Sequence, residues 1–169
     1  SLSPSNQQTF STVRGFFLTS ASWFIVATLA GFTGAISLVA PDFLQGIPWL
    51  VFGRVRPIHT NLMIFGFVGA ALLGGVHYFV PSLVRAPLYS EKLGRATLWV
   101  YNLALAAGSI TLALGYTQSR EYAEWIWPVD VLVLLSLAMI FYNLLRTVLL
   151  REEKLLYVSV WYAFAALVF

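Results

Sequence analysis

The sequence predicts an all-α, polytopic transmembrane helical bundle, and three features lead to that fold class. Hydrophobic residues make up 59% of the 169 positions and charged residues only 10%, whereas a typical soluble domain carries about 25% charged residues. The charged residues cluster between long uncharged runs that reach or approach the roughly 20 residues needed to cross a bilayer. These runs do not alternate with a period of two, so helices are favoured over a closed barrel.

Four full membrane spans and the start of a fifth can be placed along the chain. The predicted helices cover residues 15–41, 57–84, 96–119, 128–149 and 155–169. We expect Pro57 and Pro128 to lie in first turns, where the N–H that proline lacks is not needed, and Asp130 to lie near a positive helix end. The fifth run reaches the last residue, so residues 1–169 are expected to form one transmembrane domain, the N-terminal part of a larger bundle.

The distribution of Lys and Arg predicts the orientation of the chain in the membrane. With a cytoplasmic N-terminus, the inner segments hold seven of the ten basic residues, namely Arg14, Arg85, Lys92, Arg95, Arg146, Arg151 and Lys154. The outer segments then hold only Arg54, Arg56 and Arg120. Because cytoplasmic loops carry an excess of Lys and Arg, the N-terminus is predicted to face the cytoplasm.

Composition also excludes several kinds of site and partner. The chain has no Cys, so it holds no disulfide, no thiolate metal site and no covalently attached c-type haem. Its net charge is only +3, and the basic residues flank apolar spans instead of lining one face. A nucleic-acid partner is therefore not expected, and the expected surrounding is the lipid bilayer.

Both histidines of the chain, His59 and His77, fall on the second predicted span. Their separation of 18 residues is five helical turns, so they are expected to share a face about 27 Å apart. Gly66 and Ala70 lie on that face and Gly74 lies close to it. Such a face suits axial ligation of a haem, which needs a neutral imidazole nitrogen and room for the porphyrin. It equally suits a hydrogen-bonded histidine in a tightly packed bundle.

Charged residues gather at the outer end of the same span. Arg54 and Arg56 precede His59, where they could pair with haem propionates or extend toward the interface in the ordinary way. Glu121 and Glu124 belong to an outer loop and would share a face if that loop were helical. Their carboxylates suit a hard cation such as Ca²⁺, although a solvated loop or a pairing with Arg120 would also account for them.

Three segments together resemble a known family. They are residues 52–61 (Phe-Gly-Arg-Val-Arg-Pro-Ile-His-Thr-Asn), residues 114–130, which contain Arg-Glu-Tyr-Ala-Glu-Trp-Ile-Trp-Pro, and residues 157–162 (Tyr-Val-Ser-Val-Trp-Tyr). In order and spacing they are similar to the catalytic subunit, subunit I, of cbb3-type cytochrome c oxidases of the haem–copper oxidase superfamily. Residues 76–81 and 88–93 lean toward nitric oxide reductases of the same superfamily.

The resemblance implies roles for particular residues. His59 matches the second-helix ligand of low-spin haem b, and Arg56 matches an arginine on the propionate side, with Arg54 as a weaker match. Glu121 matches the carboxylate associated with a calcium ion that bridges haem propionates, and Glu124 is its neighbour in that motif. His77 matches no functional position.

The resemblance also implies an activity for the complete protein. A terminal oxidase of this type reduces O₂ to water with electrons from cytochrome c and pumps protons across the bacterial inner membrane. The complete subunit would add a high-spin haem b₃ and Cu_B, whose ligands belong to later helices, so this part alone lacks the oxygen-reducing centre. Because the chain has no Cys, c-type haems would reside on membrane-anchored cytochrome subunits. A nitric oxide reductase large subunit and a truncated, non-catalytic membrane scaffold are the alternatives.

Orientation can be tested with cysteines introduced at Ser90 and Ser119, because the chain has no native Cys. In spheroplasts, an impermeant maleimide is expected to label Ser119→Cys at once and Ser90→Cys only after the membrane is permeabilised. The reverse pattern would show that the N-terminus faces outward.

Overall fold

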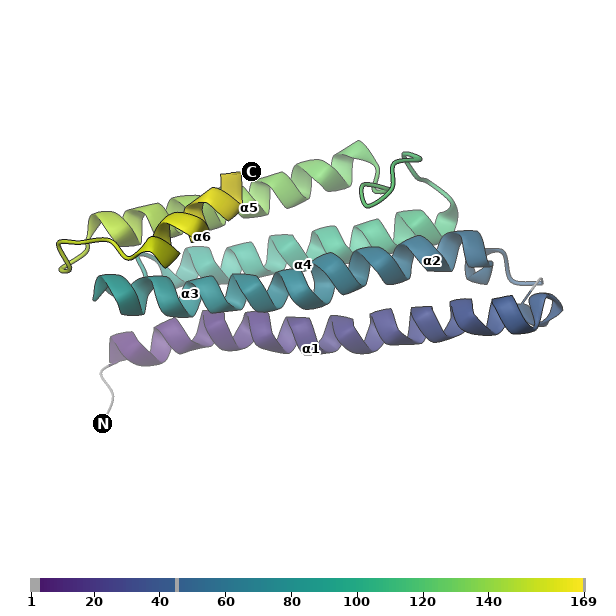
Figure 1. The fold of residues 1–169 in the computed structure, drawn as a ribbon, viewed down its shortest axis with the longest axis horizontal. Helices are drawn as coiled ribbons and strands as arrows, with labels where there is room; N and C mark the ends of the chain where they lie inside the picture. Colours follow the sequence, from purple (N-terminus) through teal and green to yellow (C-terminus); the bar gives the residue numbers. More distant parts are fainter. Residues whose placement is uncertain (1–3, 45, 169) are drawn as a thin grey trace.

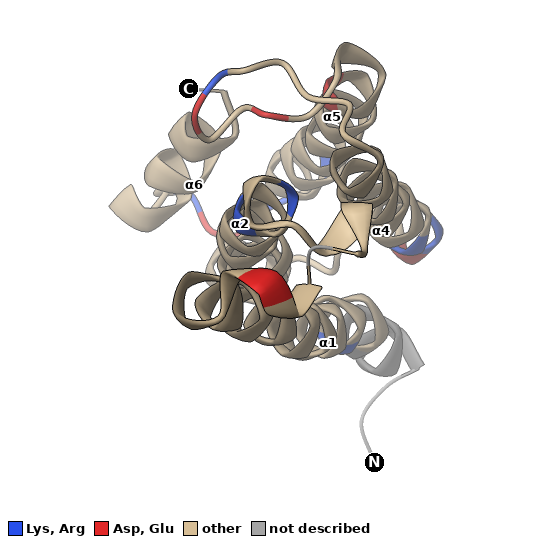
Figure 2. Ribbon diagram, turned by 90° about the vertical axis from the view of Figure 1, so that its right-hand side faces the viewer, with Lys and Arg blue, Asp and Glu red and all other residues tan. Residues whose placement is uncertain are grey.

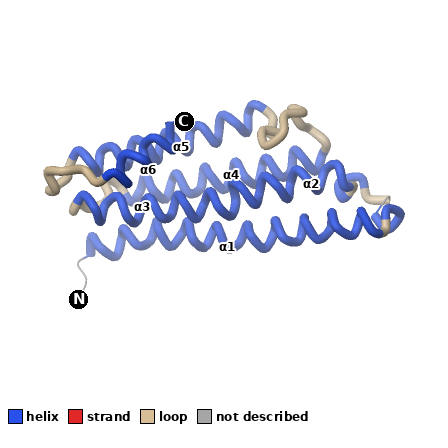
Figure 3. Tube along the Cα trace, in the orientation of Figure 1, coloured by secondary structure: helices blue, strands red, loops and turns tan. Residues whose placement is uncertain are grey.

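The structure describes residues 4–44 and 46–168, and in this part helices are joined by loops, with no strand (Figures 1 and 3). This computed structural model contains the following elements in chain order: α1 (Pro4–Val39), η1 (Pro41–Leu44), η2 (Pro48–Leu50), α2 (Phe52–Asn61), η3 (Leu62–Gly69), α3 (Ala70–Val84), α4 (Glu91–Leu114), α5 (Trp127–Leu149) and α6 (Val158–Val168). The segment η3 is a π-helix, and it joins α2 to α3 in one continuous span.

Four of these spans are long and apolar enough to cross a membrane. They are Ser11–Val39, Phe52–Val84, Glu91–Leu114 and Trp127–Leu149, and Val158–Val168 is a shorter apolar helix. Large apolar side chains face outward along them, with Leu29 61%, Phe32 65% and Leu134 67% exposed. Such surfaces suit contact with lipid tails or with further helices. The predicted all-α transmembrane bundle is therefore confirmed.

The helix ends differ from the ranges set by charged residues. The first helix begins at Pro4, so that Arg14 lies inside it, and the third begins at Glu91. Ser90 explains the latter start, because its side chain accepts a hydrogen bond from the Leu93 N–H as an N-cap. Charge-free runs mark the apolar part of a span, whereas a helix continues into the interface until a cap or turn ends it. Phe169, the last residue of the predicted fifth segment, lies outside the described residues.

Pro57 does not lie in the first turn of its helix, contrary to the sequence prediction. It is inside α2, which begins at Phe52, whereas Pro128 does lie in the first turn of α5, with Asp130 close behind. A proline in a helix interior removes one backbone hydrogen bond and crowds the preceding turn. The carbonyl that loses its partner is that of Gly53, four residues before Pro57. The Pro57 carbonyl itself accepts hydrogen bonds from Asn61 Nδ2 at 2.8 Å and Thr60 Oγ1 at 3.2 Å.

The long first helix organises the bundle, because α1 packs along the whole second span and also against α4 (Figure 1). The next layer is α5, which packs on α4 and α3. The small residues of the second span face α1: a Cβ at Gly66 would lie 2.8 Å from Trp23, and one at Gly74 would lie 3.1 Å from Phe16. At these two glycines, close approach of a helix accounts for the small side chains.

Candidate functional site

His59 lies in α2 and points at the backbone of α1. Its Nδ1 is 2.8 Å from the carbonyl oxygen of Ala27. Because a carbonyl only accepts hydrogen bonds, Nδ1 carries a proton, and in the tautomer with this single ring proton Nε2 has a free lone pair. A ring held in this way through one nitrogen is the usual arrangement of a metal-ligating histidine.

Gly31 makes this contact possible. In an α-helix the Ala27 carbonyl points toward the residue four positions later, which is Gly31. A Cβ on Gly31 would lie 2.6 Å from Nδ1 of His59, closer than atoms of two side chains can approach. The absence of that Cβ opens the Ala27 carbonyl to the imidazole.

A cavity of about 190 Å³ lies beside the His59 ring. Small residues of α1 form much of its wall, and it is lined by Ala30, Gly31, Gly34, Ala35, Leu38, Phe52, Arg56 and His59. A small-residue face was predicted on the second span, but the small residues beside His59 belong to α1. Its signal in the sequence is the spacing of two small pairs, 30–31 and 34–35.

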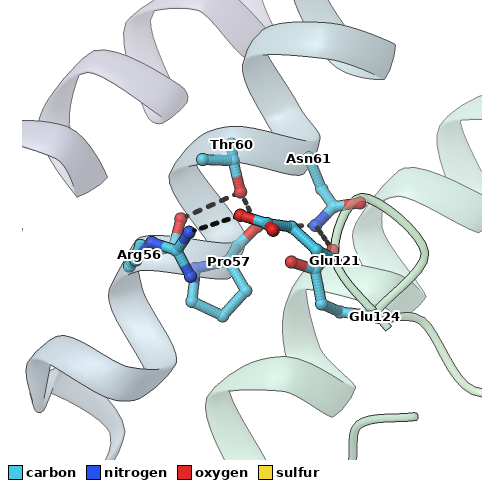
Figure 4. Close-up of polar contacts among 6 residues, drawn as sticks. All are labelled: Arg56, Pro57, Thr60, Asn61, Glu121 and Glu124. Carbon is cyan, nitrogen blue, oxygen red and sulfur yellow. Dashed lines mark hydrogen bonds and ion pairs between the residues drawn. The ribbon is translucent and has the colours of Figure 1, made fainter. Parts of the chain in front are cut away.

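The two arginines before His59 have different partners. Arg54 donates through Nη1 to the Ala113 carbonyl at 2.9 Å, and its guanidinium lies over Gly115, where a Cβ would be 3.0 Å from Nη2. Arg54 therefore caps the last turn of α4, where a cation is favoured by the helix dipole. Arg56 instead forms an ion pair with Glu121, with Nη2 and Oε1 2.9 Å apart (Figure 4).

Glu124 is the more buried of the two loop carboxylates. Its residue is 8% exposed, and Oε2 accepts a hydrogen bond from Asn61 Nδ2 at 2.7 Å, whereas the Glu121 side chain is 63% exposed. Asn61 Nδ2 thus serves both Glu124 and the Pro57 carbonyl, and Figure 4 shows all three groups around the end of α2. Asn61 belongs to the motif that contains His59, but nothing in the sequence predicted its contact with Glu124.

Glu121 and Glu124 would share a face only if their loop were helical, and it is not. The loop that carries them has no helix between Leu114 and Trp127, and Ser119 and Tyr122 have positive φ angles of 46° and 60°. In this loop the Glu121 carboxylate contacts Arg56, whereas the Glu124 carboxylate contacts Asn61.

Basic and acidic groups meet around one cavity at this end of the bundle. The cavity has a volume of about 520 Å³, and its wall includes Arg54, Arg56, Arg120, Glu121 and Glu124. Figure 2 views the bundle from this end and shows the basic positions at the start of α2. Within the described residues, no three His, Cys, Asp or Glu side chains come together to hold a metal ion. A cation here would need oxygen ligands from another source as well.

His77 has a different environment from His59. It is fully buried, its Nδ1 bonds to the Leu73 carbonyl of its own helix at 2.7 Å, and its ring stacks on Phe16 of α1 with centroids 5.1 Å apart. Both histidines thus contact α1, but His77 is enclosed by packing. This environment agrees with the alternative of a hydrogen-bonded histidine inside a bundle.

Comparison with known proteins identifies the family. Residues 11–169 match the family described as Cytochrome C and Quinol oxidase polypeptide I. The chain belongs to this family, that of haem–copper oxidase subunit I. Its members are membrane oxidoreductases of electron transport and subunits of multi-subunit oxidase complexes. Together with the four apolar spans, membership makes this chain a multi-pass membrane protein.

Several curated members of the oxidase family are similar to most of this chain. The cbb3-type cytochrome c oxidase subunit CcoN1 of Stutzerimonas stutzeri is 35% identical over 94% of the chain and 33% of its own length. A cytochrome c oxidase subunit 1 homolog of Agrobacterium tumefaciens is 38% identical over 83% of the chain and 26% of its own length. Cytochrome c oxidase subunit 1 of Rhodobacter capsulatus is 32% identical over 94% of the chain. The chain spans about a third or less of the length of these relatives.

The contact between Asn61 and Glu124 predicts an energetic coupling at the end of α2. Removing the buried carboxylate with Glu124→Ala should destabilise the protein by about 1–3 kcal/mol, because Asn61 loses a partner where water is scarce. Thermal unfolding of the purified complex, with Glu152→Ala as an exposed control, measures the effect. A double-mutant cycle with Asn61→Ala should give a coupling of about 0.5–3 kcal/mol, and additive effects would show that the contact contributes nothing.

Proposed function

We propose that this chain is the N-terminal part of the catalytic subunit of a cbb3-type terminal oxidase, and that it supplies His59 as one axial ligand of low-spin haem b. The hydrogen bond from His59 Nδ1 to the Ala27 carbonyl is the observation that carries the proposal. It leaves Nε2 free to bind iron and restrains the ring. The small residues of α1 beside the ring provide space for one edge of a planar group.

The residues present fit a haem in their chemistry. When bound, the haem carries one electron at a time through its iron. The Ala27 carbonyl restrains His59 and increases the basicity of its Nε2. Arg56 is the nearer candidate to face a propionate, because it lines the cavity beside His59. Arg54 already serves the end of α4, which supports the weaker role that its motif position suggested.

The relatives support an oxidase over a nitric oxide reductase. The similar proteins from Stutzerimonas stutzeri and Rhodobacter capsulatus are both named as cytochrome c oxidases, so O₂ is the proposed acceptor and cytochrome c the proposed electron source. In the complete subunit, a high-spin haem b₃ and Cu_B would be held by helices beyond these. The proposed partners are that remaining bundle and membrane-anchored c-type cytochromes. The proposed location is the bacterial inner membrane, with a cytoplasmic N-terminus.

The ligand assignment predicts different outcomes for the two histidines. His59→Ala should remove the low-spin haem b absorption from the assembled complex, because no other described side chain takes its place beside the α1 cavity. His77→Ala should leave that absorption in place, since its ring is enclosed against Phe16. Visible difference spectra of the two purified variants measure this.

Equal spectra from the two variants, in complexes that both assemble, would refute the assignment of His59. The same spectra separate an oxidase subunit from a scaffold. A non-catalytic scaffold need not bind haem, so a native complex without a low-spin haem spectrum would favour that alternative.

A calcium ion near Glu121 is a second part of the proposal. Glu121 pairs with Arg56, so the carboxylate already has one cationic partner, and the residues that the structure describes do not by themselves complete a metal site. Two haem propionates would add negative charge beside Arg56 and the two glutamates. A bound Ca²⁺ would balance that charge and suits all-oxygen coordination, with Glu121 as a direct ligand and Glu124 in its vicinity.

Metal analysis tests the calcium proposal. The purified native complex should retain calcium after dialysis against chelator, Glu121→Ala should lose it, and Glu152→Ala, which alters an exposed acid at the other end of the bundle, should retain it. Finding no tightly held calcium in the native complex would end this part of the proposal.

A further inference from the structure

The second membrane span contains an eight-residue π-helical segment, η3 (Leu62–Gly69). It begins less than one helical turn after His59 and separates α2 from α3. Most π-helix in proteins occurs as a single turn, and such turns are frequent at functional sites. A segment of this length needs an explanation from its surroundings.

Two hydroxyl groups from neighbouring helices bind carbonyls of this π segment. Tyr101 of α4 donates through Oη to the Phe65 carbonyl at 2.7 Å, and Ser20 of α1 donates through Oγ to the Phe67 carbonyl at 2.8 Å. Both donors are buried, with Tyr101 3% and Ser20 4% exposed. Other span hydroxyls instead bond to their own helix four residues back, as in Ser22, Thr28, Ser82 and Ser109.

Gly69 provides the space for one of these contacts. A Cβ at this position would lie 2.8 Å from Tyr101 Oη and 3.2 Å from the Ile64 carbonyl. With glycine at the end of η3, the phenol oxygen of Tyr101 reaches the Phe65 carbonyl. Gly69 and the hydroxyl groups of Tyr101 and Ser20 therefore belong to one arrangement that favours the π conformation.

The π segment sets how α2 is turned relative to α3. A π-helix places more residues in each turn than an α-helix, and a register change of one residue turns a helix by about 100°. The α3 end is anchored on α1 through Gly74 and His77, both against Phe16. The direction of the His59 imidazole therefore depends on the conformation of η3.

We infer that Tyr101 and Ser20 are positioning residues, which hold η3 in its π-helical form and thereby aim His59 at the Ala27 carbonyl and the α1 cavity. This inference rests on the proposed function of His59 as a haem ligand. If the two hydroxyls are removed, η3 can adopt α-helical geometry and the imidazole turns away from its present direction.

The test uses Ser20→Ala, Tyr101→Phe and their combination in the intact complex. Electron paramagnetic resonance of the oxidised low-spin haem and its midpoint potential report the ligand geometry. The double variant should show a second low-spin signal or a shifted midpoint potential. Ser20→Thr, which keeps a hydroxyl at this position, should show the native signal and the native potential. Ser22→Ala and Ser109→Ala remove hydroxyls that serve their own helices and should change neither reading.

Each outcome separates this inference from the proposed function. If His59→Ala leaves the low-spin signal intact, the ligand assignment itself fails. If His59→Ala removes the signal but the double variant keeps the native spectrum and potential, only the positioning role of Tyr101 and Ser20 is overturned.

A second pair of variants applies if the double variant does not assemble. Gly69→Ala pushes a methyl group against Tyr101 Oη, so it should alter the low-spin signal. Gly75→Ala is the matched control, because a Cβ at Gly75 meets no atom within 4 Å, so it should leave the low-spin signal unchanged. A native low-spin signal in Gly69→Ala would overturn the inference.

Discussion

The hydrogen bond between the Ala27 carbonyl of α1 and Nδ1 of His59 is the contact on which the geometry of the site depends. It exists because Gly31 leaves the carbonyl accessible and because α1 follows the second span along its whole length. The same close packing encloses His77 against Phe16. Along the contact between α1 and the second span, His59 therefore lies beside a cavity, whereas His77 lies inside the core.

Polar groups at the His59 end of the bundle are paired across elements. Arg54 ties the start of α2 to the end of α4, and Arg56 and Asn61 hold the following loop through Glu121 and Glu124. The buried Glu124 contact excludes water more fully than the exposed Arg56 pair, so it contributes more to the order of the loop. This end therefore presents an ordered, charged rim next to the proposed haem edge.

The fold class was predictable because long uncharged runs in a chain without Cys leave few alternatives, and His59, Arg56 and Glu121 were placed at one end by topology alone. The internal position of Pro57, the π segment and the burial of Glu124 were not. The π segment and the burial of Glu124 involve contacts between separate elements, Tyr101 with Phe65 and Asn61 with Glu124, which no periodicity within one helix reveals. The wall beside His59 was missed for the same reason, since Gly31 acts on a residue of another helix.

Iron ligation by His59 is measured most directly by a crystal or cryo-electron microscopy structure of the intact oxidised complex at a resolution that defines the histidine rings. We expect iron bonded to Nε2 of His59, with Nδ1 of the same ring still within hydrogen-bonding distance of the Ala27 carbonyl. Iron coordinated by another side chain in place of His59, or a His59 ring turned so that Nδ1 has left Ala27, would contradict this expectation.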